Sequence, residues 1–150
     1  MADDWTVVMT AKGTNRLGVE NKRTGDAVMI KTQGLTHIHL IVRDLERALY
    51  FYKEVFGMRE RFRDGNAMVF LNTPGSQDSI TLNEDPSKLE VAGQSGGIAH
   101  FGFRLANKPD LDAAVREVER CGGKLLSRGE HAPGVAYAYV CDPDGYVSEL

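Results

Sequence analysis

The sequence has no cluster of basic residues, no long apolar run and very little cysteine. Its 150 residues include 18 Lys and Arg against 21 Asp and Glu, which gives a net charge of −3. Because the basic residues are scattered, they form no positive stripe for a nucleic-acid backbone or an anionic membrane surface. No apolar run approaches the ~20 residues that cross a bilayer. We therefore expect neither nucleic acid nor membrane as a partner.

The two cysteines are too isolated to indicate a disulfide framework or a zinc site. Cys121 is predicted near the end of a helix and Cys141 in a strand, and neither belongs to a Cys-x-x-Cys or Cys-His pattern. The opening residues, MADDWTVVMTAKG, are too polar for a secretory signal. These features predict two reduced, packed thiols in a cytoplasmic protein.

The sequence does contain a repeated order of predicted elements. A strand over about 35–42 precedes an amphipathic helix that begins after Asp44 and ends at Gly57. Three short strands follow, separated by the turn signals DG and TPGS. After the polar segment 84–97, the order of strand, helix and three strands returns, with Pro109 at the start of the helix.

This repeat predicts an α+β fold of two paired βαβββ units, over about 35–83 and 98–150. Because each unit is too small to enclose a core alone, we expect the two to pair and form a curved mixed-sheet cup. Residues 1–33 lie outside the repeat. Their alternation of apolar and polar residues predicts an N-terminal extension with two or three short strands.

Strand parity places polar side chains of separate strands on one face of the predicted cup. His37 and His39, in THIHLIV, project opposite the aliphatic residues of their strand. In IAHFGFRL, His100 and Arg104 project opposite the phenylalanines, and in the last strand Glu149 comes from YVSEL. Such residues recur in both repeats, which favours a binding site over separate solvent-exposed histidines.

Three stretches carry a family resemblance: GLTHIHLIVRDLERALYFYKEVFGM, GGIAHFGFRL and YAYVCDPDGYVSEL. Over residues 34–150 the chain resembles the vicinal oxygen chelate superfamily, which includes glyoxalase I, bleomycin and fosfomycin resistance proteins, methylmalonyl-CoA epimerase and extradiol dioxygenases. The resemblance implies a divalent metal at the base of the cup, with His37, His100 and Glu149 as ligands. His39 is the alternative to His37, which the spacing from the preceding GL favours.

The sequence departs from this family at the fourth ligand position. Relatives such as glyoxalase I place Glu or Gln there, whereas this chain has Thr81, a poor ligand. Two histidines and one carboxylate leave coordination positions open, which suits Fe(II) or Mn(II). Imidazole and carboxylate ligands also accept Zn, Ni or Co.

The resemblance implies an extradiol-type dioxygenase acting on a small molecule. Tyr139 matches a family tyrosine ten residues before the carboxylate ligand, His131 matches a histidine near the preceding hairpin, and His39 is expected to transfer protons. Further side chains predicted to contact the substrate are Arg104, Thr81 and Tyr137.

Two other functions remain open at this point. One is a glyoxalase-type lyase or epimerase, with water at the Thr81 position, and the other is a non-enzymatic, antibiotic-binding resistance protein. Family half-cups commonly complete one another across a dimer interface, so we expect a homodimer. The sequence leaves open whether the units pair within one chain or between two.

Overall fold

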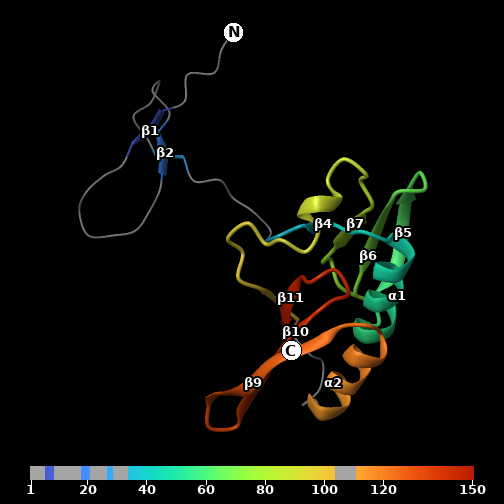
Figure 1. The fold of residues 1–150 in the computed structure, drawn as a ribbon. Coiled ribbons are helices and arrows are strands. Elements are labelled where there is room, and N and C mark those ends of the chain that lie inside the picture. Colours follow the sequence, from blue (N-terminus) through green and yellow to red (C-terminus); the bar gives the residue numbers. More distant parts are fainter. Residues whose placement is uncertain (1–5, 9–17, 21–26, 29–33, 104–110) are drawn as a thin grey trace. The chain divides into compact units, whose positions relative to one another are not determined.

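The structure is a computed structural model that describes residues 6–8, 18–20, 27–28, 34–103 and 111–150 (Figure 1). It divides into two units, Met1–Leu35 and Thr36–Leu150, which are described separately. The first contains a three-stranded antiparallel sheet in the order β1-β2-β3. Its strands are β1 Thr6–Val8, β2 Gly18–Glu20 and β3 Ala27–Val28.

The second unit contains the predicted repeat. The first copy consists of β4 Ile38–Ile41, α1 Leu45–Phe56, β5 Arg59–Asp64, β6 Met68–Asn72 and β7 Ile80–Asn83. A connecting segment includes the short 3-10 helix η1, Leu89–Val91. The second copy consists of β8 Phe101–Gly102, α2 Leu111–Arg120, β9 Lys124–Ala132, β10 Val135–Cys141 and β11 Val147–Glu149.

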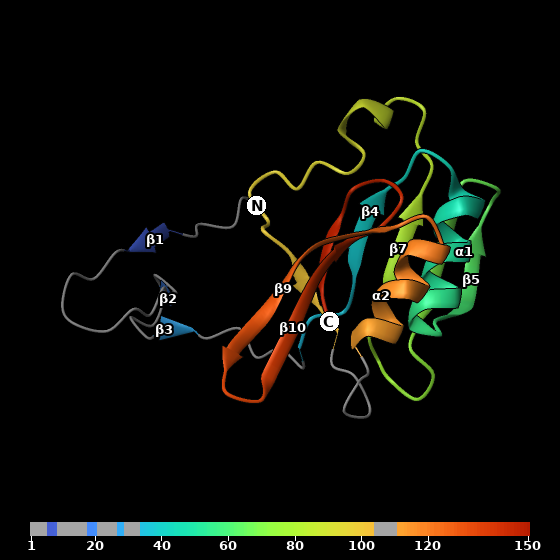
Figure 2. The same ribbon diagram turned by 60° about the horizontal axis from the view of Figure 1, so that its bottom comes forward.

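Each copy forms a four-stranded mixed sheet, in the orders β4-β7-β6-β5 and β8-β11-β10-β9. β4 and β7 run parallel, as do β8 and β11, while the other neighbouring strands are antiparallel. α1 packs on β6 and β7, α2 packs on β9 and β10, and the two helices pack together (Figure 2). The predicted α+β fold of two βαβββ units is confirmed.

The local sequence explains where α1 begins and ends. The side chain of Asp44 accepts a hydrogen bond of 2.8 Å from the backbone N–H of Arg47, so it caps the first turn. Gly57 follows the helix with φ of 62°, in the left-handed region that glycine adopts without a steric penalty. The apolar side chains lie on one face, which is buried against the sheet.

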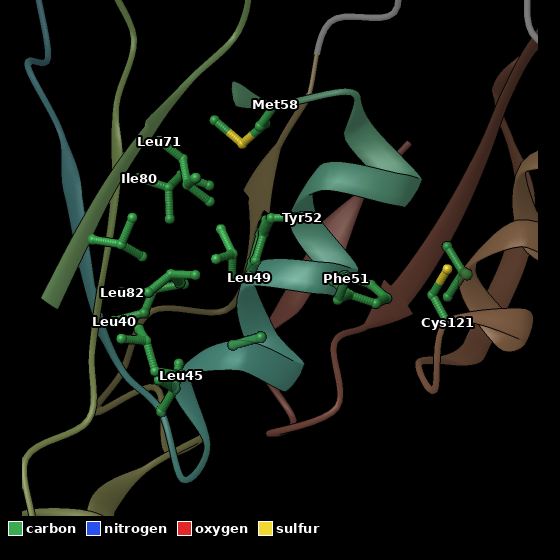
Figure 3. Close-up of a cluster of buried hydrophobic side chains, with 14 of the residues drawn as sticks. Leu40, Leu45, Leu49, Phe51, Tyr52, Met58, Leu71, Ile80, Leu82 and Cys121 are labelled. Atoms are coloured by element: carbon green, nitrogen blue, oxygen red, sulfur yellow. The ribbon is translucent and has the colours of Figure 1, made fainter. Parts of the chain in front are cut away.

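The hydrophobic core is shared by both copies of the repeat. Around α1 it contains Leu45, Leu49, Phe51 and Tyr52, together with strand residues such as Leu82 (Figure 3). The same cluster continues into the second copy through Val115, Val118, Cys121, Ala138 and Val140. Both cysteines are buried free thiols, as predicted.

A buried polar network joins the turn between β10 and β11 to α1. One carboxylate oxygen of Asp142 accepts hydrogen bonds of 2.8–3.0 Å from the backbone N–H groups of Asp144, Gly145 and Tyr146. Its other oxygen accepts a hydrogen bond of 3.0 Å from the Tyr52 hydroxyl. Burial raises the pKa of both Asp142 and Tyr52. This network fixes the turn that leads into the last strand.

A second carboxylate of the same turn, Asp144, binds residues at the start of α1. Its side chain is fully buried and lies 2.8 Å from Nη2 of Arg47, and it accepts the backbone N–H of Arg43 at 3.1 Å. Arg43 also donates to the carbonyl of Ala92 in the connecting segment. The two copies and their connection are therefore held together by charge-assisted hydrogen bonds.

In the part of the chain that the structure describes, no helix is both long and apolar enough to span a membrane.

Candidate functional site

The clearest cluster of polar side chains lies on the second sheet, around Glu149. Its Oε1 atom is 2.7 Å from Nε2 of His131, and its Oε2 atom is 3.0 Å from Nε2 of His100. The hydrogen bond to His131, together with the charges of both histidines, lowers the pKa of Glu149. The carboxylate is therefore ionised at neutral pH and held between two imidazoles.

Two tyrosines of β10 lie beside this carboxylate. Tyr139 is directly opposite Glu149 in the antiparallel pair, and its ring centroid is 4.8 Å from that of His100. The ring centroid of Tyr137 lies 5.0 Å from that of Tyr139, and its ring stacks on His131 with 4.3 Å between centroids. Desolvation and the Glu149 charge raise the pKa of Tyr139, so its phenol remains protonated and able to donate a hydrogen bond.

The first sheet carries a second group of predicted residues. His39 of β4 pairs with Thr81 of β7, and the same line of residues continues through Phe70 of β6 to Phe62 of β5. This line lies on the face away from α1, because Leu40 and Leu82, which alternate with it, belong to the core. Sequence parity found His39 and the family resemblance found Thr81, but neither found the neighbouring pair of phenylalanine rings.

His39 and Thr81 have environments that suit contact with a ligand. Desolvation, then the nearby charges of His37 and Lys88, lower the pKa of His39, which favours the neutral imidazole. Thr81 is only 1% exposed, and its hydroxyl has no hydrogen-bond partner among the described residues. A buried hydroxyl without a partner is costly, so a bound water or substrate oxygen would satisfy it.

Strand register relates the two sheets residue by residue. In the parallel pairs, His39 is opposite Thr81 in the first sheet, and Gly102 is opposite Glu149 in the second. Gly34 and Gly97 each lie three residues before a histidine, and aligning the repeats on them makes His37 the counterpart of His100. In this alignment His39 corresponds to Gly102, and the strand pairs then make Thr81 the counterpart of Glu149. The internal repeat thus supports pairing His37 with His100 as equivalent residues.

The structure brings together five of the eight predicted site residues that it describes. His100, His131, Tyr137, Tyr139 and Glu149 form one contact cluster. The exposed His37 has its Nδ1 atom 3.0 Å from the Thr36 hydroxyl, and no hydrogen bond between described residues links His37, His39 or Thr81 to the cluster. Arg104 lies outside the described residues.

The donor atoms of the cluster fit part of a metal site. Ligand atoms that each lie about 2.1 Å from one ion, at a right angle, are about 3 Å apart. His100 Nε2 and Glu149 Oε2 are 3.0 Å apart, so they fit two neighbouring ligand positions. Among the described residues, no group of three histidine, cysteine or acidic side chains is arranged to hold an ion. A third ligand must therefore come from outside this pair.

Sequence reasoning also missed Gly129, which lies opposite Tyr137 in the β9–β10 pair. The only signal is the glycine within RGEH, two residues before His131. A glycine inside a strand often marks a close approach by another group.

Comparison with known proteins gives a consistent family. The Glyoxalase/Bleomycin resistance protein/Dioxygenase superfamily matches residues 34–150. Catechol-2,3-dioxygenase of Bacillus subtilis is 33% identical over 120 residues, which cover 77% of this chain and 41% of that protein. A lactoylglutathione lyase of Arabidopsis thaliana is 32% identical over 127 residues, which cover 76% of this chain and 42% of that protein. The chain thus spans less than half the length of these two relatives.

A solved structure shows the same fold. It is a mutant of the fosfomycin resistance protein FosX of Listeria monocytogenes, in complex with Mn(II) and a dihydroxypropylphosphonic acid. The TM-score is 0.65 at 22% identity, and the match covers 80% of this chain and 90% of that one. From the match over residues 34–150, the chain belongs to the Glyoxalase/Bleomycin resistance protein/Dioxygenase superfamily.

Proposed function

We propose that the protein is a metal-dependent enzyme of the extradiol dioxygenase type, which opens the ring of a small catechol-like substrate. The observation that carries the proposal is the contact between a ligand pair, His100 and Glu149, and two groups able to handle protons, His131 and Tyr139. The 33% identity to a catechol dioxygenase of Bacillus subtilis supports it.

In this proposal His37, His100 and Glu149 hold the ion. When bound, Fe(II) or Mn(II) would supply a Lewis acid with open positions and an accessible redox change. The assignment of His37 follows from its equivalence to His100 in the repeat. Glu149 contributes the negative charge of the site, and the hydrogen bond from His131 orients its carboxylate.

The remaining side chains act on the substrate directly. His39, kept neutral by desolvation, accepts a proton from a substrate hydroxyl. Tyr139, kept protonated, donates a hydrogen bond to the developing oxyanion of the substrate. The unpartnered Thr81 hydroxyl binds a substrate oxygen. The ring of Tyr137 contacts the substrate from the side of Tyr139. Arg104 is proposed as a contact to a charged substituent.

A glyoxalase-type lyase or epimerase is the second candidate, and Thr81 favours it. Its unpartnered hydroxyl occupies the position equivalent to Glu149, where a bound water would complete a four-ligand set. Such chemistry needs a Lewis acid and a base but no redox change, so Zn, Ni or Co would suffice.

Metal reconstitution separates the two candidates. Protein purified without oxygen is loaded with Fe(II), Mn(II), Zn, Ni or Co, and each form is assayed for O₂ uptake with a panel of catechols. We expect turnover with Fe(II) or Mn(II), and substrate binding without turnover for Zn, which has no accessible redox step. Turnover of a hemithioacetal or acyl-CoA substrate with Zn, and no O₂ uptake with any catechol, would establish the lyase instead.

We also expect a homodimer, because half-cups of this family commonly complete one another across a dimer interface. Among the described residues, no third side chain joins His100 and Glu149 in a group arranged to hold an ion. Light scattering should give a mass near twice 16.5 kDa over a range of concentrations. A monomer mass that does not change with concentration, in metal-loaded protein, would contradict this expectation.

Mixing two inactive variants tests whether the site is shared between chains. If it is, subunits carrying His37→Ala and Glu149→Ala restore one intact site per mixed dimer, and metal binding returns. If each chain completes its own site, neither subunit of the mixture has an intact ligand set. Metal content after mixing then stays at the level of the separate variants.

A further inference from the structure

We propose that Tyr137 is a positioning residue for His131, and that Gly129 provides the space in which the Tyr137 ring lies. The proposal rests on the proposed function only in treating His131 and Glu149 as parts of the reactive site. It is carried by the contacts among four residues on β9, β10 and β11, and it gives the glycine inside β9 a specific purpose.

His131 must cross a strand to reach Glu149. β10 lies between β9, which carries His131, and β11, which carries Glu149. The imidazole crosses β10 over the ring of Tyr137, with a centroid distance of 4.3 Å and an angle of 21° between the planes. From there its Nε2 atom lies 2.7 Å from the Glu149 carboxylate. The tyrosine ring is thus the surface that supports the histidine along its path.

The position of that ring depends on Gly129. Gly129 is directly opposite Tyr137, and a Cβ atom there would lie 2.9 Å from the Tyr137 hydroxyl oxygen and 3.1 Å from two ring carbons. These three nearest atoms all belong to the outer end of the Tyr137 side chain. A methyl group at residue 129 would therefore displace the ring, at little cost to the strand backbone.

Displacing the ring removes support from the Glu149 carboxylate. The two oxygens of Glu149 each face one histidine, so the carboxylate orientation depends on both imidazoles. Partners that orient a metal-binding side chain typically contribute about 10–100-fold to metal affinity or activity. We expect a loss of that size when the Tyr137 ring no longer supports His131.

The test uses histidine NMR signals of the metal-free protein, which do not depend on catalysis. Carbon-bound protons of an imidazole that stacks on an aromatic ring are shifted upfield by its ring current. The chain has only four histidines, so a His131→Gln spectrum assigns the signal. We expect the upfield shift of His131 to persist in Tyr137→Phe and to be lost in Tyr137→Leu, Gly129→Ala and Gly129→Val.

Gly102→Ala is the matched control. It places a methyl group beside Glu149, whose backbone oxygen and Cβ are the nearest atoms at 3.9 and 4.0 Å, an ordinary contact that does not involve the Tyr137 ring. We expect its His131 signal to match the wild type. Circular dichroism of every variant checks the fold, and Mn(II) binding is measured for the same set.

The outcomes separate this proposal from the proposed function. An unchanged His131 signal in both Gly129→Val and Tyr137→Leu would overturn the positioning role. The positioning role would also be overturned if the wild type binds Mn(II) and these variants bind it with the same affinity. If wild-type protein binds none of the five metals, the proposed function fails, while the NMR signals still decide whether Tyr137 positions His131.

Discussion

Replacing His100 or Glu149 by alanine is expected to remove the metal from the protein while leaving its fold intact. Each substitution deletes one donor of a three-ligand set, so affinity should fall by more than the roughly 100-fold seen for residues that only orient ligands. Both side chains are partly exposed and lie outside the hydrophobic core, so neither change creates a cavity.

Metal content by mass spectrometry and thermal unfolding with and without metal provide the measurement. The wild type should gain stability from added metal, whereas the two variants should not, because stabilisation follows binding to the folded state. Glu130→Ala, which removes an exposed carboxylate from β9, is the matched control and should behave like the wild type. Folded variants that keep full metal content would refute the ligand assignment.

Replacing His39 by alanine should lower turnover by about 10²–10⁴-fold while metal remains bound, if His39 transfers the substrate proton. The structure places His39 on the face of the first sheet away from α1, beside Thr81, where desolvation keeps its imidazole neutral. Tyr139→Phe should have a smaller effect, because it removes one hydrogen bond and leaves the ring in place.

Steady-state kinetics and metal content, measured on the same preparations, test this assignment. His37→Ala is the informative comparison, since it is expected to lose metal rather than proton transfer. If His39→Ala loses metal and His37→Ala keeps it, the two histidines exchange roles. Full turnover by metal-loaded His39→Ala would exclude a proton-transfer role.

The repeat and its fold were predictable because both depend on local signals. The helix cap at Asp44, the left-handed Gly57 and the alternating strands each act over a few residues, and they appear twice in the same order. Parity also placed His100 and Glu149 on one face correctly, although His100 lies just before the short strand β8. Local patterns therefore predicted the architecture and the shared face of His100 and Glu149.

The contact between His131 and Glu149 could not be read from parity. β9 and β10 change register between Val135 and Ala136 and again between Tyr139 and Val140. Each such irregularity breaks the correspondence between residue number and facing partner, so counting along β9 does not show what His131 contacts across β10. Its position depends on the ring of Tyr137, which is a tertiary contact.

The core that runs through both copies of the repeat affects how the two copies can diverge. Phe51 of α1 lies so close to Gly123 that a Cβ atom on this glycine would be 2.8 Å from its ring. A change at this contact between Phe51 and Gly123 disturbs both copies, which we expect to unfold together in a single cooperative transition. A change on the open face of one sheet disturbs that sheet alone. A duplicated unit can therefore keep one architecture while its two halves acquire different chemistry, with Thr81 in one and Glu149 in the other.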